Sequence, residues 1–237
     1  MSINLAELPQ SSIDFYSERS IPGIQLSPQP NPLSLILYLP VSLARDNVEL
    51  FIKQQFRLKH GALIKHYMPY LLSLENSDNQ VLAAAGFRPA CKDELFLEQY
   101  LDKSVEHYLQ LKLGEKIQRS SIIEVGNLAS DSPGSSRLMI MAMTCLFDQQ
   151  GFEWVVMTGT NELINIFKNL SLKPVPLAHA RASCLKEEQF NWGSYYTHNP
   201  RVLAGNIKNG HKKLLQSNHY RQFINSLCAC NLPPCTK

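Results

Sequence analysis

Two glutamates in apolar surroundings are the residues of this sequence best suited to move a proton. Glu124 lies inside the apolar run Ile122–Val125, and Glu98 lies inside Phe96–Leu101, FLEQYL. A carboxylate in such a segment is salt-bridged, faces solvent, or is buried with a raised pKa. The first two alternatives give a structural residue. The third gives a general base, because a carboxyl group with a raised pKa can take a proton from an amine near neutral pH.

A turn of small residues follows Glu124. It contains Pro133, Gly134, Ser135 and Ser136, and Arg137 then begins a run with helical spacing. Free backbone N–H groups and the helix dipole favour a phosphate group at such a helix N-terminus. Gly134, Ser135 and Ser136 are therefore candidate phosphate-binding residues, and Arg137 is a candidate ion-pair partner. A tight loop that binds nothing is the alternative.

Several further side chains have either a functional or a structural interpretation. Arg88 can clamp a substrate carboxylate or pack against Phe87 at the surface. Tyr100 can act as an acid toward a leaving thiolate or only pack. Trp192 and Tyr195 suit an acyl-binding pocket, although aromatic side chains belong more often to the core.

The candidate residues must be positioned by strands and helices, and the sequence predicts both along the chain. Strands are expected over residues 33–39, 67–74, 81–88, 96–101, 122–125, 153–157, 175–181 and 194–197, and helices over 45–59, 104–113, 137–150, 161–172 and 211–226. The elements on either side of Gly134 predict a βαβ unit. The predicted fold is α/β (α+β): a mixed sheet, antiparallel at one end, with a splayed βαβ crossover and helices on both faces.

Composition and charge exclude several classes of protein. The chain has 237 residues, 44% hydrophobic and 18% charged, and a net charge of +3, which does not indicate a nucleic-acid partner. The spacing of its histidines and six cysteines predicts no metal site. We find no secretory signal and no membrane-spanning run, so we expect a cytoplasmic protein. We expect a proline-rich extended segment at 1–32, one domain at 33–210, and a C-terminal helix with a cysteine-containing tail at 211–237.

Six strings resemble the thermostable hemolysin family over about Arg45 to Gly210. They are Gly86-Phe87-Arg88, Leu95–Leu101, Ile123–Ala129 with its EVGNLA sequence, Trp154-Val155-Val156, Asn165-Ile166-Phe167 and Trp192–Tyr196. That family is similar to the GNAT acyltransferases, close to the acyl-homoserine-lactone synthases. The resemblance implies a GNAT-like fold, in which an acyl thioester lies between two splayed strands.

The resemblance also implies roles for particular residues. Glu124, with Glu98 as the second candidate, is expected to bind and deprotonate an amine, and Tyr100 completes the catalytic set. Gly134, Ser135, Ser136, Arg137, Asn127 and Leu128 are expected to bind the thioester's pyrophosphate and arm; Arg88, Phe87, Trp192 and Tyr195 are expected to bind substrate. GNAT proteins usually carry more than one glycine in this turn, and this chain carries Gly134 alone. The binding of an acyl-carrier-protein donor is less affected by this missing glycine than the binding of acyl-CoA.

The function expected from the resemblance is N-acyl transfer from an acyl thioester to an amine such as an amino acid derivative. The thioester is acyl-CoA or an acyl-phosphopantetheine arm on acyl-carrier protein, with no tightly bound cofactor. A monomer or a homodimer is expected. Two alternatives stay open: a hemolysin that damages membranes directly, and a GNAT-like binding module without catalysis.

Overall fold

The computed structural model describes residues 33–91 and 94–231, with side chains up to residue 227. The expected proline-rich segment, residues 1–32, and the end of the cysteine-containing tail, residues 232–237, lie outside this part of the chain. Within the described residues, no helix combines the length and apolar character needed to cross a membrane.

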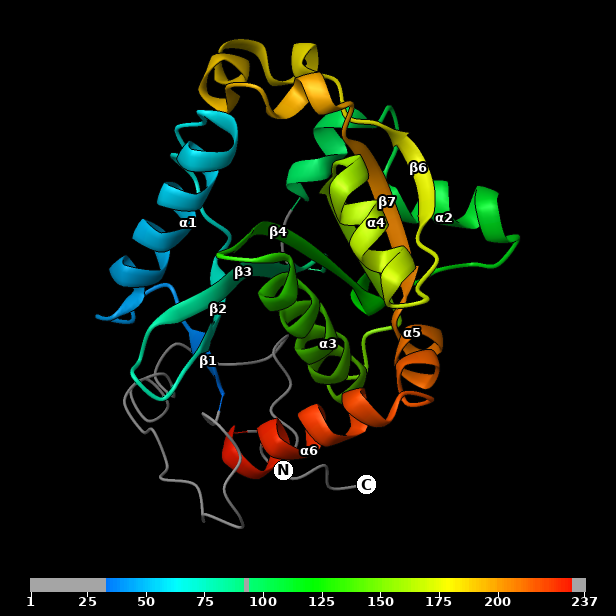
Figure 1. The fold of residues 1–237 in the computed structure, drawn as a ribbon. Coiled ribbons are helices and arrows are strands. Elements are labelled where there is room, and N and C mark those ends of the chain that lie inside the picture. The colour runs from blue at the N-terminus through cyan, green and yellow to red at the C-terminus, as the bar shows by residue number, and fades with distance from the viewer. Residues whose placement is uncertain (1–32, 92–93, 232–237) are drawn as a thin grey trace.

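The described residues form a seven-stranded mixed sheet in the order β1-β2-β3-β4-β5-β7-β6 (Figure 1). The strands are β1 Ser34–Tyr38, β2 Tyr70–Glu75, β3 Val81–Pro89, β4 Ile122–Ser130, β5 Trp154–Gly159, β6 Val175–His179 and β7 Arg201–Asn206. Among the strands of the described residues, only β4 and β5 pair in parallel, and antiparallel pairs continue the sheet on both sides of them. The predicted α+β class is confirmed, with antiparallel pairing at two ends of the sheet instead of one.

Helices cover both faces of the sheet, as predicted. They are α1 Arg45–His60, α2 Val105–Leu113, α3 Pro133–Gln149, α4 Asn161–Asn169, α5 Ile207–Leu214 and α6 Asn218–Asn231, with 3₁₀ segments η2 Phe96–Tyr100, η3 Arg119–Ser121, η4 Ala182–Trp192 and η5 Tyr195–His198. One face packs against α3, α4, α5 and α6, and we call it the α3 face. The other packs against α1 over β2 to β4 and against α2, η2 and η4 over β4 to β7, and we call it the α1 face.

The alternation of side chains along β4 assigns each of its residues to a face. Ile123 and Val125 belong to the core of the α3 face, and Ile122 belongs to that of the α1 face. Side chains two apart on a strand share a face, so Glu124 lies on the α1 face with Ile122. The carboxylate therefore lies where the helix α1 and the segment η2 meet over the sheet.

The two parallel strands separate after a short paired stretch. β4 and β5 pair only from Ile122 with Trp154 to Val125 with Met157, although both strands continue beyond these residues. Opposite this point the register between β3 and β4 shifts between Ala84 and Gly86, and Asn127 has a φ of 51°. An extra residue bends a strand and increases its local twist. The bulge at Asn127 accounts for the predicted splay, which is confirmed.

Three predicted elements were wrong in type or extent. The FLEQYL segment is the 3₁₀ turn η2 and not a strand, because the Glu98 carboxylate accepts from the Leu95 backbone N–H at 2.9 Å and closes the turn. The SYYT segment is the 3₁₀ turn η5. The predicted terminal helix is two helices, α5 and α6, separated by a turn in which Ser217 Oγ accepts from the Tyr220 N–H at 3.4 Å.

The segment formed by η4 and η5 lies against the C-terminal end of α1, at the top of Figure 1. The His60 carbonyl accepts from the Ser194 N–H at 2.8 Å, and the Asn191 carbonyl accepts from the Leu63 N–H at 2.6 Å. A Cβ atom added at Gly193 would meet the His60 carbonyl oxygen at 2.0 Å. Glycine is required at position 193 for this close approach, which holds the aromatic residues of η4 and η5 near α1.

Candidate active site

A cleft of about 200 Å³ lies where β4 and β5 separate, between α1, α4 and the η4–η5 segment. Of the side chains predicted to form a site, those that line the cleft are Arg88, Tyr100, Glu124, Asn127, Leu128, Ser136, Trp192 and Tyr195. They come from β3, β4, η2, η4, η5 and α3, so the fold brings together residues that are far apart in sequence. Glu98, Phe87, Gly134, Ser135 and Arg137 do not line it.

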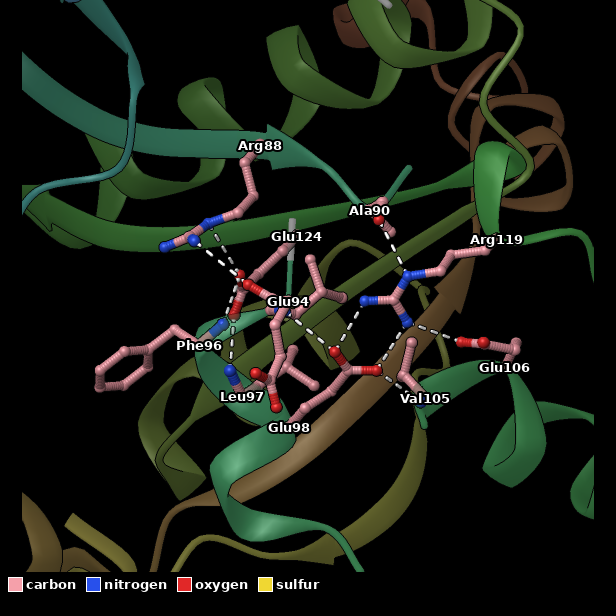
Figure 2. Close-up of polar contacts among 11 residues, drawn as sticks. Arg88, Ala90, Glu94, Phe96, Leu97, Glu98, Val105, Glu106, Arg119 and Glu124 are labelled. Carbon is pink, nitrogen blue, oxygen red and sulfur yellow. Dashed lines mark hydrogen bonds and ion pairs between the residues drawn. The ribbon is translucent and has the colours of Figure 1, made fainter. Parts of the chain in front are cut away.

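Glu124 is held at the floor of the cleft by two backbone N–H donors and by an ion pair with Arg88. Its Oε2 atom accepts from the Phe96 N–H at 3.0 Å and lies 3.2 Å from Arg88 Nε, and its Oε1 atom accepts from the Leu97 N–H at 2.8 Å (Figure 2). The residue is only 2% exposed. Burial raises the pKa of Glu124 from 4.5 to about 7, against the opposite effects of Arg88 and the two amides. The carboxylate is thus poised to exchange a proton near neutral pH.

Arg88 is the counter-ion of Glu124. Its Nε atom also lies 3.3 Å from the sulfur of Met68, whose side chain packs over Gly86 and Gly126. The Arg88 side chain is 23% exposed and lines the cleft, so a part of the guanidinium remains accessible to a substrate. The predicted contact of Arg88 with a substrate carboxylate therefore stays a prediction. The ion pair between Arg88 and Glu124 was not indicated by the sequence.

Glu98 occupies a different environment from Glu124. Its carboxylate makes a bidentate ion pair with Arg119, at 2.7 and 2.8 Å, and accepts from the N–H groups of Leu95 and Val105, each at 2.9 Å. Burial acts to raise the pKa of Glu98, but the Arg119 and backbone hydrogen bonds outweigh it and hold this pKa at about 2. Such a carboxylate is a poor base, and it does not reach the cleft. The prediction that the two carboxylates share the proton transfer does not agree with this geometry.

Aromatic side chains form one wall of the cleft. Trp192 and Tyr195 have ring centroids 5.3 Å apart, and Phe96 of η2 and Phe56 of α1 each lie 6.2 Å from Trp192. The Tyr100 and Tyr196 hydroxyls are 2.5 Å apart. Burial raises the pKa of Tyr100 strongly, with the neighbouring Tyr196 adding to the effect, so the Tyr100 hydroxyl stays protonated.

The N-terminus of α3 is capped by its own sequence. Ser132 Oγ accepts from the Ser135 N–H at 3.2 Å, and Pro133 at the first helical position has no N–H to satisfy. Of the predicted phosphate-binding turn, Ser136 alone lines the cleft, where its hydroxyl shares a hydrogen bond with that of Ser130. The predicted roles of Gly134, Ser135 and Arg137 have no support from the lining of the cleft.

Asn127 has a structural task in the strand bulge. Its Oδ1 atom accepts from the Met68 N–H at 2.8 Å, and its Nδ2 atom donates to the His66 carbonyl at 3.3 Å. Arg45 donates to the Met68 and Pro69 carbonyls, each at 2.7 Å, from the other side. The segment before β2 is thereby clamped between α1 and the bulge, while Asn127 and Leu128 still line the cleft as predicted.

Phe87 lies in the core of the α3 face and does not line the cleft, so its predicted contact with substrate has no support from the geometry. Its ring stacks on Tyr70 at 5.3 Å and meets Phe147 at 5.4 Å, and the residue is fully buried. The Arg88 side chain points to the opposite face of the sheet, because neighbouring residues of a strand alternate between the two faces. The sequence string Gly86-Phe87-Arg88 thus combines one core residue with one cleft residue.

Sequence reasoning missed several residues of the cleft, among them His60, Lys59 and Glu162. Burial lowers the pKa of His60, helped by Lys59 and His198, and its Nδ1 atom is buried without a partner among the described residues. Lys59 of α1 pairs with Glu162 of α4 at 2.6 Å. No local pattern distinguishes these residues from an ordinary helix end, since tertiary packing alone brings them to the cleft.

A second cavity, of about 530 Å³, lies on the α3 face of the sheet, lined by residues of α3, α4, α5, β5 and β7. Most of its lining is apolar, including Ile140, Met143 and Phe167. Val125, Leu128 and Met157 line both this cavity and the cleft. These three residues come from the two strands that separate, so the splay is where the cleft and the second cavity adjoin.

Comparison with protein-family models gives a match to the model described as thermostable hemolysin, over residues 40–211. The chain belongs to the thermostable hemolysin family. In this family member, the EVGNLA string is the strand that carries Glu124 and the bulge, and the FLEQYL string is the turn that binds the Glu124 carboxylate. No curated protein is significantly similar to the chain.

Two solved structures of low sequence identity, FeeM and TofI, share the fold of this family member with TM-scores above 0.5. FeeM, an N-acyl amino acid synthase from uncultured soil microbes, is 11% identical, with a TM-score of 0.55 over 80% of this chain and 98% of FeeM. TofI, in a ternary complex with an inhibitor and MTA, is 12% identical, with a TM-score of 0.52 over 79% of this chain and 99% of TofI. The AHL synthase LasI is 11% identical, with a TM-score of 0.48 over 73% of this chain and 90% of LasI. The predicted GNAT-like resemblance is therefore confirmed for the fold, on the similarity to FeeM and TofI.

Proposed function

We propose that this protein is an N-acyltransferase that moves an acyl group from a thioester to an amine. One observation carries the proposal: Glu124 is buried at the floor of a cleft between splayed strands, with a pKa raised to about 7 and two backbone amides on its carboxylate. An ammonium group must lose a proton before its nitrogen can attack a carbonyl carbon. A fixed carboxylate of this pKa can accept that proton at neutral pH.

In the proposed reaction the amine nitrogen attacks the thioester carbonyl carbon, the C–N bond forms and the C–S bond breaks. Glu124 accepts the proton that the amine loses, and the leaving sulfur takes up a proton to become a free thiol. Tyr100 lines the cleft and is kept protonated by burial, so it suits hydrogen bonding to the leaving sulfur. A backbone N–H of β4 beyond the pairing with β5 is the candidate donor to the oxyanion of the tetrahedral intermediate.

The donor is an acyl-CoA or an acyl-carrier protein with an acyl-phosphopantetheine arm. The proposed contacts for the arm are Leu128, at the splayed end of β4, and Ser136, near the start of α3. The apolar second cavity suits the acyl chain, which would pass between β4 and β5 at Val125, Leu128 and Met157. A cavity of about 530 Å³ favours chains longer than acetyl.

The proposed acceptor is an amine that also carries a carboxylate, such as an amino acid derivative. Arg88 lies next to Glu124, and Lys65 also lines the cleft; Lys59 and His66 line it as well but lie against Glu162 and Glu188. A guanidinium pairs well with a carboxylate, and Glu124 takes the ammonium end of the same molecule. FeeM, which shares the fold, is described as an N-acyl amino acid synthase, and this supports the same class of acceptor.

The test is a donor and acceptor screen with the purified protein. Acyl-CoA thioesters of increasing chain length and the corresponding acyl-carrier proteins are each combined with a panel of amino acids and simple amines. Thiol release and the mass of the amide product are measured. Glu124→Gln is expected to lose turnover. The matched control is Glu75→Gln, because Glu75 is also buried in the sheet but is bonded by Tyr38 and Ser73 away from the cleft.

Two outcomes would contradict the proposal. Lysis of protein-free liposomes together with no turnover of any thioester would favour a direct hemolysin. Binding of acyl thioesters without turnover, unchanged by Glu124→Gln, would favour a binding module without catalysis.

A further inference from the structure

The turn η2 makes two sets of contacts in opposite directions. The N–H groups of Phe96 and Leu97 point to the Glu124 carboxylate, whereas the side chain of the next residue, Glu98, points to Arg119 (Figure 2). These three residues are consecutive in a single tight turn. A displacement of Glu98 must therefore move the two amides that bind Glu124.

Glu98 is anchored by more bonds than a surface ion pair. Arg119 grips its two carboxylate oxygens, and the same oxygens accept from the Leu95 and Val105 N–H groups. Arg119 is fixed in turn by donating to the Ala90 carbonyl at 2.9 Å and to Glu106 at 2.8 Å. The bonds join η2 to the end of β3, to the start of α2 and to η3, so the turn has defined partners on three sides.

We propose that Glu98 and Arg119 are positioning residues, whose ion pair holds η2 so that the Phe96 and Leu97 amides stay on the Glu124 carboxylate. The consequence for turnover rests on the proposed function, in which Glu124 is the base. The consequence for the Glu124 carboxylate itself needs no substrate.

The proposal explains why η2 carries one carboxylate of low pKa, that of Glu98, and binds another of raised pKa, that of Glu124 in β4. Glu98 remains ionised and paired throughout the physiological range, while Glu124 exchanges its proton near pH 7. The charged groups that act on the pKa of Glu124 are Arg88 of β3 and Glu98 of η2. The same cleft is also lined by further charged or titratable side chains, which are Lys59, His60, Lys65, His66, Tyr67, Tyr100, Glu162, Glu188, Tyr195 and Tyr196. Arg88 lowers the pKa of Glu124 and Glu98 raises it, so a test must separate charge from position.

Arg119→Lys makes that separation, because it keeps the positive charge but removes the two-pronged geometry. The Glu124 carboxyl is followed by ¹³C NMR in protein labelled at the glutamate side-chain carboxyl, with Glu124→Gln used to assign its resonance. In Arg119→Lys we expect the titration midpoint of the Glu124 carboxyl to rise by about one pH unit, which is a tenfold change in its acid dissociation constant. The reason is that the hydrogen bonds from the Phe96 and Leu97 amides to the charged carboxylate are lost or lengthened. Glu106→Gln is the matched control: it removes another partner of Arg119 but leaves η2 bound, so its midpoint should equal that of the wild type.

An Arg119→Lys midpoint equal to the wild-type value would overturn the proposal. Glu98→Gln is the second variant, should Arg119→Lys not fold. In the wild type the Leu97 amide proton is expected to shift as Glu124 titrates, and in Glu98→Gln the amplitude of that shift should fall by about half or more, because the N–H···O bond weakens steeply with misalignment. An undiminished amplitude would also overturn the proposal.

The titration separates this proposal from the proposed function. If no thioester is turned over but the midpoint moves, the positioning role stands and the enzymatic reaction fails. If turnover occurs with an unchanged midpoint, the positioning role fails alone. With both correct, the kcat–pH profile of Arg119→Lys shifts to higher pH by the same amount as the NMR midpoint.

Discussion

Glu124→Gln is predicted to change how the stability of the protein depends on pH, independently of any activity. The pKa of Glu124 is raised in the folded state, so the folded protein holds a proton that the unfolded chain releases above about pH 4.5. Wild-type stability therefore contains a favourable contribution at low pH that is lost as the pH rises from about 4.5 to 7. The glutamine variant has no such proton to lose.

The magnitude follows from the size of the shift. A rise from 4.5 to about 7 corresponds to about 3 kcal/mol, at about 1.4 kcal/mol per pKa unit. The residue is 2% exposed, so solvent screens little of this free energy. We expect Glu124→Gln to gain about 2–3 kcal/mol relative to the wild type between pH 4.5 and pH 8.

The assay is urea unfolding of wild type and variant at intervals between pH 4.5 and 8. The difference between their unfolding free energies removes the effect of groups that titrate equally in both. Glu98→Gln is the control whose difference from the wild type should stay constant between pH 4.5 and 8, because the lowered pKa of Glu98 stabilises the fold above about pH 4.5 and that contribution is lost only as the pH falls from there toward 2. Parallel stability curves for Glu124→Gln and wild type would refute the assignment of a raised pKa to a buried Glu124.

Further predictions concern neutral pH, the η4–η5 segment and the acyl chain. At pH 7, Glu98→Gln should lower the unfolding free energy by about 2–3 kcal/mol in urea titrations, because it breaks a buried bidentate ion pair; an unchanged value would contradict that contribution. Gly193→Ala should lower Tm and raise KM for the acyl donor, since its Cβ meets the His60 carbonyl; Gly134→Ala, whose Cβ comes no closer than 3.6 Å to its neighbours, should keep the wild-type Tm. Met143→Trp partly fills the second cavity and should move the preferred donor toward shorter chains, measured as kcat/KM across the acyl series; an unchanged preference would place the chain elsewhere.

The sequence predicted the parts of the fold that local patterns determine. The apolar runs around Glu124 and Trp154, with a small-residue turn and a helical run between them, indicated the βαβ unit. The polar segment 75–80 separated the strands that pair as β2 and β3. Glu124 itself was predictable, because a single carboxylate in an apolar strand needs a special environment.

Other features depend on contacts between distant segments and left no local signal. FLEQYL has the composition of a strand, but the side chain of Glu98 bonds to its own turn and to Arg119, which is 21 residues away. Phe87 and Arg88 are neighbours in sequence, and only the orientation of β3 decides which one faces the cleft. His60 reaches the cleft because the segment around Gly193 packs on the end of α1.

The most direct test of the account is amine-dependent thiol release from a long-chain acyl thioester, measured for wild type, Glu124→Gln and Glu75→Gln across pH 5 to 9. The account predicts that wild type and Glu75→Gln form an amide whose rate rises through about pH 7 as Glu124 ionises, and that Glu124→Gln loses this reaction. Amide formation by Glu124→Gln at the wild-type rate, with the same pH profile, would contradict it.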